Sequence, residues 1–439
     1  MPGTRSAFWF RRDLRFEDNH GFYRALAASE EVLPVFIFDP VILDRLDDPA
    51  DRRIDFIHRR LVELDARLRG AGRGGLLVLH GDVSRTWSEI FARYGLDALH
   101  CNRDYEPYAR ERDAGIAGLA AGAGVAFHAH KDQVRFERDE VLKPDGNPYT
   151  VFTPYKKQWL AAHLREPARS YPSETLLGRC RGAALPPVPS LESMGFARTD
   201  LEAPPATVDV RRLRGYGRLR DFPAENATSR LGVHLRFGTV SVRDVVSRAE
   251  EIDQVWFGEL IWREFFMMIL HHFPYSAAAA FKRRYENIPW RDDMGDFAAW
   301  REGRTGYPLV DAGLRELVAT GHMHNRVRMV AASFLVKHLL LDWRWGERWF
   351  ASKLLDYDLA ANAGNWQWAA GTGCDAAPYF RIFNPVTQAK RFDPDTAYIR
   401  RWVPEIGTPD YPEPMIDHAF ARERALRTYR AALGGRDAT

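Results

Sequence analysis

Glu259, Trp262 and Arg263 form the group of side chains in this sequence that most clearly suggests chemistry. They occupy positions i, i+3 and i+4 of an apolar-periodic stretch, so a helix there carries all three on one face. A carboxylate, a flat ring and a guanidinium on one face suit the binding of an aromatic base with its phosphates.

Two further segments carry side chains of the same kinds. Asn325, Arg328 and Met329 repeat the spacing on a second expected helix. A third segment supplies two carboxylates, an amide and two indole rings: Asp356, Asp358, Asn362, Trp366 and Trp368. Buried carboxylates and amides need partners, so three such faces that converge predict a polar-lined pocket inside a helical domain.

Other motifs do not point to chemistry. Gly70–Gly75 is rich in glycine, but it follows an expected helix and precedes a strand, which is the reverse of a dinucleotide fingerprint or a P-loop. The pairs His271/His272 and His322/His324 have no carboxylate at the spacing of a metal site. No Gly-x-Ser-x-Gly motif occurs. We therefore expect neither a protein nucleophile nor a bound metal.

The composition excludes several classes of protein. Of 439 residues, 46% are hydrophobic and 28% charged, which is enough apolar surface for a folded chain. Three cysteines are too few for a disulfide scaffold. No run of about 18 apolar residues exists, so no membrane span is expected. The first residues carry charges where a signal peptide needs an apolar core, which predicts a cytoplasmic protein.

The two halves of the chain differ in charge. Residues 1–210 contain 29 Lys and Arg against 31 Asp and Glu, whereas residues 211–439 contain 33 against 28. The second half is mildly basic, and its cations are almost all arginine, which suits phosphate recognition. A GC-rich coding bias explains the arginine content equally well.

The first 130 residues alternate short apolar runs with helical patterns. Expected strands are Ala7–Phe10, Val32–Phe38, Leu76–His80, Ala98–Cys101 and Val125–His128. Asp55–Leu68 has the spacing of an amphipathic helix. The alternation predicts an α/β domain with a doubly wound parallel sheet and ligands at the carboxyl ends of its strands.

The rest of the chain has a different character. Residues 131–205 are rich in proline, and we interpret them as a connector with a helix near Tyr155–Leu164. From 206 to 439 the strand signals vanish, which predicts an all-α domain. Its expected helices are Val240–Ile252, Gln254–His272, Leu309–Thr320, Asn325–Leu341 and Trp345–Leu354.

Over nearly its whole length the sequence resembles the DNA photolyase/cryptochrome family. The segments that carry the resemblance are Thr228–Leu231, Glu259–Phe265, His324–Met329, Asp356–Asn362 and Trp366–Trp368. They occur in the order and spacing of the family. The sequence is most similar to class I cyclobutane pyrimidine dimer photolyases.

This resemblance implies that the helical domain binds FAD. The residues that match cofactor-binding positions are Tyr216, Thr228, Ser229, Arg230, Leu231, Trp256, Arg263, Asn325, Arg328, Asp356, Asp358 and Asn362. Asn362 matches the residue that faces flavin N5, where photolyases carry Asn, plant cryptochromes Asp and animal cryptochromes Cys. Asn362 therefore favours repair. Gly232 stands where the family often has Ser, so the resemblance implies that one side-chain hydrogen bond to the cofactor is lost or replaced by one from the backbone.

The resemblance also implies a partner, UV-damaged DNA with a flipped-out pyrimidine dimer. Matching pocket residues are Glu259, Trp262, Asn325, Met329 and Trp368, with Arg220 and Gln388 as DNA contacts outside it. In the implied reaction, excited reduced FAD passes an electron to the dimer, the ring splits and the electron returns. Glu259 and Asn362 are the catalytic residues implied at the dimer and the flavin. Trp366, Trp343 and Trp290 match the chain that photoreduces oxidised flavin.

Two alternatives to this function and one open question about cofactors remain. A cryptochrome photoreceptor without repair activity would share the fold, and so would a (6-4) photolyase, which by resemblance uses histidine chemistry in the pocket. Tyr108, Ala109 and Ala278 stand where folate-binding members carry Asn, Glu and Lys, so a folate antenna is disfavoured. A deazaflavin, a flavin or no antenna are all open. The resemblance predicts a monomer.

Overall fold

The computed structural model describes residues 4–167 and 169–434. The described chain forms two compact units. The first contains residues 4–140, 160–208 and 230–251, and the second contains residues 141–159, 209–229 and 252–434. The division into functional domains at 130 and 205 stays a prediction.

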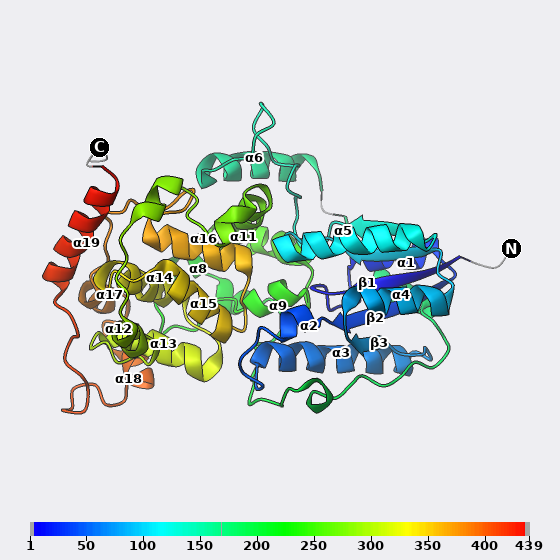
Figure 1. Cartoon of the computed structure of the whole chain (residues 1–439), viewed down its shortest axis with the longest axis horizontal. Helices are drawn as coiled ribbons and strands as arrows, with labels where there is room; N and C mark the ends of the chain where they lie inside the picture. The colour runs from blue at the N-terminus through cyan, green and yellow to red at the C-terminus, as the bar shows by residue number, and fades with distance from the viewer. Residues whose placement is uncertain (1–3, 168, 435–439) are drawn as a thin grey trace. The chain divides into compact units, whose positions relative to one another are not determined.

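The first unit is built on a five-stranded parallel sheet with the order β3-β2-β1-β4-β5 (Figure 1). The strands are β1 (Arg5–Phe10), β2 (Glu31–Phe38), β3 (Leu77–His80), β4 (Ala98–Asn102) and β5 (Ala126–His130). The apolar runs of the sequence predicted all five strands within two residues at each end. This confirms the expected α/β fold class with a parallel sheet.

Helices cover both faces of this sheet, as buried parallel strands require. Trp9 packs against Trp87 with ring centroids 5.6 Å apart, whereas the adjacent Phe8 packs against Phe22 at 5.1 Å. Successive side chains of a strand point to opposite faces, so α4 and α1 lie on different faces. The helices of this unit are α1 (His20–Ala28), α2 (Pro40–Leu43), α3 (Arg52–Gly70), α4 (Val83–Tyr94), α5 (Pro107–Gly122), α9 (Gly232–Phe237) and α10 (Val242–Ile252).

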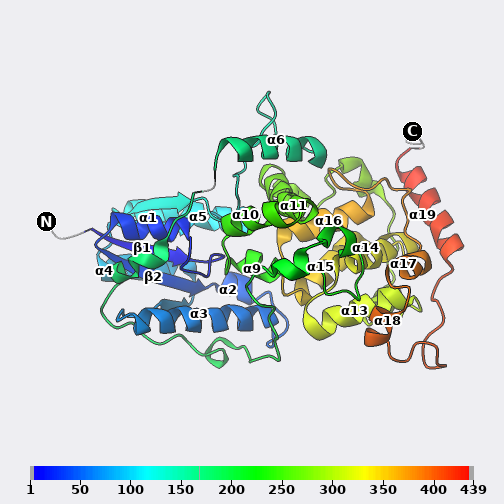
Figure 2. The same cartoon turned by 180° about the vertical axis from the view of Figure 1, so that it is seen from behind.

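The second unit consists of helices and loops in its described residues. Its helices are α7 (Val210–Leu213), α8 (Tyr216–Leu219), α11 (Gln254–His272), α12 (Met294–Arg301), α13 (Pro308–Thr320), α14 (Asn325–Ser333), α15 (Trp343–Lys353), α16 (Leu359–Ala370), α17 (Pro385–Phe392), α18 (Ala397–Trp402) and α19 (His418–Ala432). A further helix, α6 (Phe152–Arg165), begins in this unit and ends in the first. Figure 2 shows α13 to α16 grouped together.

One expected helix is divided in the structure. The apolar periodicity of Asn325–Leu341 predicted a single helix, but α14 ends at Ser333 and a π-helix follows at Phe334–His338. The amide of Leu339 donates to the carbonyl of Phe334, 3.0 Å away, which is the wider i→i+5 bond of that conformation. The apolar run continues through the change, so periodicity could not detect it.

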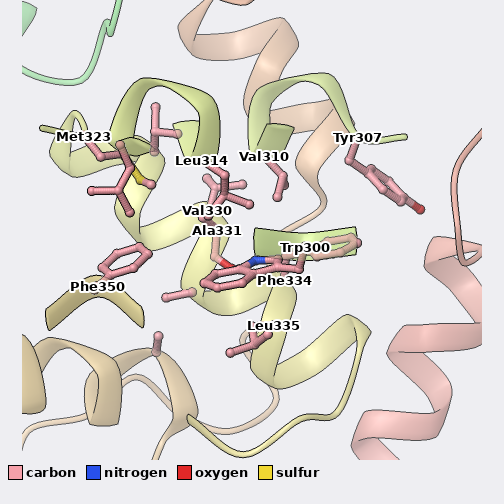
Figure 3. Packing of buried hydrophobic residues seen from close by; sticks show 14 of the residues in the cluster. Trp300, Tyr307, Val310, Leu314, Met323, Val330, Ala331, Phe334, Leu335 and Phe350 are labelled. Atoms are coloured by element: carbon pink, nitrogen blue, oxygen red, sulfur yellow. The ribbon is translucent and has the colours of Figure 1, made fainter. Parts of the chain in front are cut away.

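The core of the second unit surrounds Trp300, which is fully buried. Its indole Nε1 donates to the carbonyl of Ala331 at 3.2 Å (Figure 3), and its ring stacks on that of Phe350 with centroids 6.1 Å apart. This bond satisfies the one polar atom of a large buried ring. The core packs α14, α15 and α16 together and so fixes the surface of the site described next. Within the described residues, no helix has the length and apolar character needed to cross a membrane.

Candidate active site

A cavity lies among α14, α15, α16 and the loop that leads into α16. The predicted site residues that line it are Asn325, Arg328, Met329, Asp356, Asp358, Asn362, Trp366 and Trp368. Two of the three polar faces expected from the sequence therefore meet around one hollow.

The start of α16 and a close helix contact position this wall of the cavity. Asp358 caps α16 by accepting a hydrogen bond from the amide of Ala361 at 3.2 Å. Asn362 and Trp366 follow one turn apart, so both face the cavity. A Cβ atom added to Gly346 would lie 2.1 Å from the ring of Trp366, so this glycine lets α15 approach the indole.

The amide of Asn362 is held by Glu347 of α15. Its Nδ2 donates to the backbone carbonyl of Glu347 at 3.1 Å and to the carboxylate Oε1 at 2.9 Å. Both N–H bonds are used, so the oxygen Oδ1 is the part of the side chain left to bind a ligand. Burial raises the pKa of Glu347. Sequence reasoning missed this residue, although Glu347 lies one helical turn after Trp343.

Arg328 and Asp356 form an ion pair at the cavity wall. The guanidinium Nη2 lies 3.1 Å and 2.9 Å from the two carboxylate oxygens, and Nε donates to the carbonyl of Met323 at 2.7 Å. This pair ties α14 to the loop before α16. The pair presents hydrogen-bond donors and acceptors to the cavity without adding net charge there. Such a surface suits the hydroxyls and polar edges of a nucleotide cofactor.

His324 determines where α14 begins. Its Nδ1 accepts a hydrogen bond from the amide of Arg326 at 3.2 Å and so caps the helix. Burial lowers the pKa of His324 to about 4. The ring is therefore neutral near pH 7, as a hydrogen-bond acceptor must be.

Three of the predicted substrate residues lie together at the cavity. Asn325 Nδ2 contacts the sulfur of Met329 at 3.9 Å, and both line the hollow. The ring of Trp368 also lines it and is flanked by Phe383, 6.5 Å away, and by the guanidinium of Arg381, 5.9 Å away. An apolar and aromatic surface of this kind suits a flat base.

Glu259 and Trp262 do not line this cavity. Trp262 on α11 stacks on the ring of Phe152, with centroids 3.6 Å apart and planes 9° apart. Glu259 pairs with Arg220, whose guanidinium also lies 5.5 Å from the ring centroid of Tyr216. The structure thus gives these two α11 side chains partners in Arg220 and Phe152, and neither side chain is among those that line the cavity.

The remaining predicted cofactor residues are dispersed along the chain. Trp256 is buried and Arg263 half-buried on α11. Thr228 and Ser229 belong to the second unit. Arg230 and Leu231 belong to the first unit, where Arg230 has a left-handed backbone with φ 53° and Leu231 is the N-cap of α9.

The three predicted relay tryptophans all contact the core of the second unit. Trp366 and Trp343 are buried in it, and Trp290 packs against it from its edge. Trp366 lies edge-on to Phe350, 4.9 Å away. Gln388 on α17 has a buried Oε1 for which the described residues offer no hydrogen-bond partner.

The cavity has the chemistry that FAD requires. An amide oxygen, an ion pair and two indole rings supply hydrogen-bond acceptors, charge and stacking surface on three neighbouring walls. No group of three or more His, Cys, Asp and Glu side chains among the described residues is arranged to hold a metal ion.

Comparisons with known proteins agree with this chemistry. A family model described as the FAD binding domain of DNA photolyase matches residues 256–410, and one described as DNA photolyase matches residues 6–173. A deoxyribodipyrimidine photo-lyase of Halobacterium salinarum is 37% identical, covering 97% of this chain and 99% of the relative. One of Salmonella typhimurium is 38% identical over 97% of this chain and 98% of its own. The chain belongs to the DNA photolyase family.

Solved structures of photolyases share the whole fold. A bacterial class III photolyase from Agrobacterium tumefaciens has a TM-score of 0.86 at 34% identity, covering 98% of both chains. An archaeal photolyase from Sulfolobus tokodaii, solved with two FAD molecules, has a TM-score of 0.82 at 34% identity, covering 98% of this chain and 100% of its own. The expected family and the expected FAD cofactor are thereby confirmed.

Proposed function

We propose that this protein is a deoxyribodipyrimidine photo-lyase that splits cyclobutane pyrimidine dimers in UV-damaged DNA under light. Membership of the photolyase family supports light-driven DNA repair. The observation that carries the finer proposal is the cavity in which Asn362, fixed by Glu347, faces the same hollow as Trp368 and Met329.

Bound FAD supplies a light-excited electron donor. The chain's own residues would hold and orient it. The Asn362 amide presents Oδ1 because Glu347 occupies its two N–H bonds. Arg328 and Asp356 would bind the polar edge of the cofactor, and Asp358 would add a carboxylate beside them.

The substrate side of the proposal rests on the mouth of the cavity. Trp368 and Met329 would receive the extruded dimer, and Asn325 would donate a hydrogen bond to it. Extruding a damaged dinucleotide costs only a few kcal/mol, because its stacking and pairing are already weakened. Arg220 and Gln388 would contact DNA outside the cavity.

The proposed roles of Glu259 and Trp262 at the dimer require both side chains to change partners when DNA binds. In the structure Arg220 holds Glu259, and Phe152 covers Trp262. Substrate would have to exchange these partners before Glu259 could accept a hydrogen bond from a pyrimidine.

Several finer proposals accompany this function. We propose a monomer in the cytoplasm with functional divisions near 130 and 205. A second chromophore of the first unit would be a deazaflavin or a flavin if one binds. Tyr108 supports the exclusion of folate, because its hydroxyl donates to Asp39 at 2.6 Å and its ring is flanked by Arg45 and Arg112.

The test is repair of a thymine dimer in a short DNA strand by the chemically reduced holoenzyme under near-UV or blue light. We expect loss of the dimer with light and none in the dark. Trp368→Ala should reduce repair without lowering FAD content, while Trp402→Phe, a conservative change on α18 outside the cavity, should repair normally. Dimers left intact by a reduced, illuminated enzyme that still photoreduces its flavin would favour the cryptochrome alternative. Selective repair of (6-4) photoproducts would favour the alternative that the protein is a (6-4) photolyase.

A further inference from the structure

Asn365 is a polar side chain in the wall of the cavity to which the proposed function gives no role. It lies on α16, three residues after Asn362 and three before Trp368, and all three side chains line the hollow. Residues three apart share a helix face. Asn365 is exposed whereas Asn362 is buried, so Asn365 is the amide of α16 that lies at the mouth of the cavity.

One hydrogen bond fixes the orientation of the Asn365 amide. Its Nδ2 donates to the backbone carbonyl of Ala361, one turn earlier in α16, at 2.8 Å. A carbonyl oxygen can only accept, so the amide cannot turn over without losing this bond. Within the described residues, the second N–H of Nδ2 and the oxygen Oδ1 make no hydrogen bond with the protein. One donor and one acceptor in a fixed order therefore remain for a ligand.

Local structure gives no reason for an asparagine at this position. The side chain of asparagine competes with the backbone for hydrogen bonds, so it favours caps and turns over the middle of a helix. Asn365 lies in the middle of the 12-residue α16, and its one hydrogen bond returns to its own helix. A residue that is locally unfavourable and links no other element indicates a role toward a ligand.

The extruded dimer brings hydrogen-bonding groups that the cavity must satisfy. Each thymine has an imide edge in which an N–H donor lies between two carbonyl acceptors, and the cyclobutane ring leaves this edge unchanged. Outside the duplex these edges have lost their paired bases, and burying them without partners is costly. Asn325 can serve one edge, whereas Glu259 is held by Arg220. The second edge needs a partner that is available before DNA binds, and Asn365 is available.

We propose that Asn365 recognises the imide edge of one pyrimidine of the dimer. Its Oδ1 accepts from the N3–H of the base, and the second N–H of Nδ2 donates to the neighbouring O4 carbonyl. Amides on α14 and α16, Asn325 and Asn365, then hold the lesion from two walls of one cavity. The inference rests on the proposed function, because it concerns the substrate of that same site.

The fixed amide makes Asn365 a residue that determines specificity. Cytosine has an acceptor at N3 and an amino donor in place of O4, which is the reverse of the order in thymine. Because the bond to Ala361 prevents the amide from turning over, Asn365 suits thymine and opposes cytosine at the contacted position. The parent should therefore bind a thymine–thymine dimer more tightly than a dimer with cytosine at that position, and Asn365→Leu should reduce this preference.

Binding of dimer-containing DNA in the dark tests the proposal without photochemistry. Asn365→Leu keeps the size of the side chain and removes its donor and acceptor. We expect the dissociation constant of the holoenzyme for a short duplex with one thymine dimer to rise about tenfold, or about 1.4 kcal/mol. Asn365→Ala, which favours the helix, should behave likewise. The matched control is Asn287→Leu, a change at an exposed asparagine outside the cavity, and it should bind as the parent does.

Methylated substrates test the hydrogen bond itself. Two duplexes carry an N3-methyl group on either the 5′ or the 3′ thymine of the dimer, which removes the N–H that Asn365 would bind. One of the two should weaken binding by the parent about tenfold and have a much smaller effect on Asn365→Leu, because the bond is already absent there. Methyl effects that are equal in the parent and the variant on both thymines would overturn the proposal.

Further readouts separate this inference from a structural role and from the proposed function. The FAD content and thermal unfolding of Asn365→Leu should match those of the parent. A loss of FAD with unchanged affinity for the dimer would overturn the proposal and assign Asn365 to the cofactor. If the parent repairs dimers and Asn365→Leu binds them equally tightly, only this inference is refuted. A parent that neither binds nor repairs dimers would refute the proposed function and this inference with it.

Discussion

Replacing Asn362 with aspartate tests whether Glu347 positions the amide. The Nδ2 atom that lies 2.9 Å from Glu347 Oε1 would become an oxygen, and the backbone carbonyl of Glu347 would face it at 3.1 Å. The two N–H donors of Asn362 would be lost. The new carboxylate oxygen of the variant would face two other acceptors, the backbone carbonyl and the carboxylate of Glu347. If both carboxyl groups were ionised, their repulsion at an effective dielectric of about 20 would reach about 6 kcal/mol.

The pair would avoid this repulsion by keeping one proton. Holding a proton at pH 7 on a carboxyl whose ordinary pKa is 4.5 costs about 3 kcal/mol. Asn362→Asp should therefore lower the free energy of unfolding by about 3 kcal/mol at pH 7. The folded-state pKa of the pair is raised, so this stability is present below the unfolded value near 4.5 and is lost as pH rises above it. The deficit should shrink toward pH 5.

Guanidinium denaturation followed by tryptophan fluorescence is a suitable assay, because ten of the 13 tryptophans lie at or after position 256 and report on the helical part. The control is the double variant Asn362→Asp/Glu347→Gln, which removes one charge and restores a donor. It should recover most of the loss at pH 7. A single variant as stable as the parent at pH 7, or a deficit that is equal at pH 7 and pH 5, would refute the reasoning.

Three further predictions concern the helices around the cavity. Gly346→Ala should destabilise the protein by about 1–3 kcal/mol, because the new Cβ would overlap the ring of Trp366; an unchanged unfolding midpoint would contradict this packing. His324→Ala should remove about 1 kcal/mol of helix capping at pH 7. The folded-state pKa of His324 is depressed from 6.5 to about 4, so its contribution to the free energy of unfolding is present above pH 6.5 and is lost as the pH falls toward 4. Urea titrations should therefore show that the difference in unfolding free energy between parent and variant narrows over this range. Trp366→Phe should block flavin photoreduction but leave repair by chemically reduced enzyme largely unchanged, and equal loss of both would show that Trp366 serves structure.

Local patterns in the sequence were sufficient for most elements. The strands of the parallel sheet are short apolar runs in the sequence, and those runs placed β1 to β5 within two residues at each end. The predicted bounds Gln254–His272 are those of α11. The periods of two residues for a strand and 3.6 residues for a helix are properties of the local backbone. They can therefore be recognised in the sequence without knowledge of the fold. The motifs around Asn325 and Asp356 likewise identified the family and its cofactor.

Periodicity could not reveal a change of helix type. The expected helix Asn325–Leu341 continued through Lys337 because its apolar pattern is unbroken. The structure widens the helix there, and Lys337 meets the carbonyl of Ala370, 33 residues further along the chain.

The sequence by itself determined which side chains share a helix face, and thereby the nucleotide chemistry and the family. Only the tertiary structure decided which faces meet. It paired Asn362 with Glu347, Arg328 with Asp356 and Glu259 with Arg220, and it turned Trp262 onto Phe152. The physical reason is that a face is fixed by backbone geometry within a few residues, whereas its partner depends on how whole helices pack. Packing follows from the summed burial of many side chains, and no single spacing in the sequence encodes it.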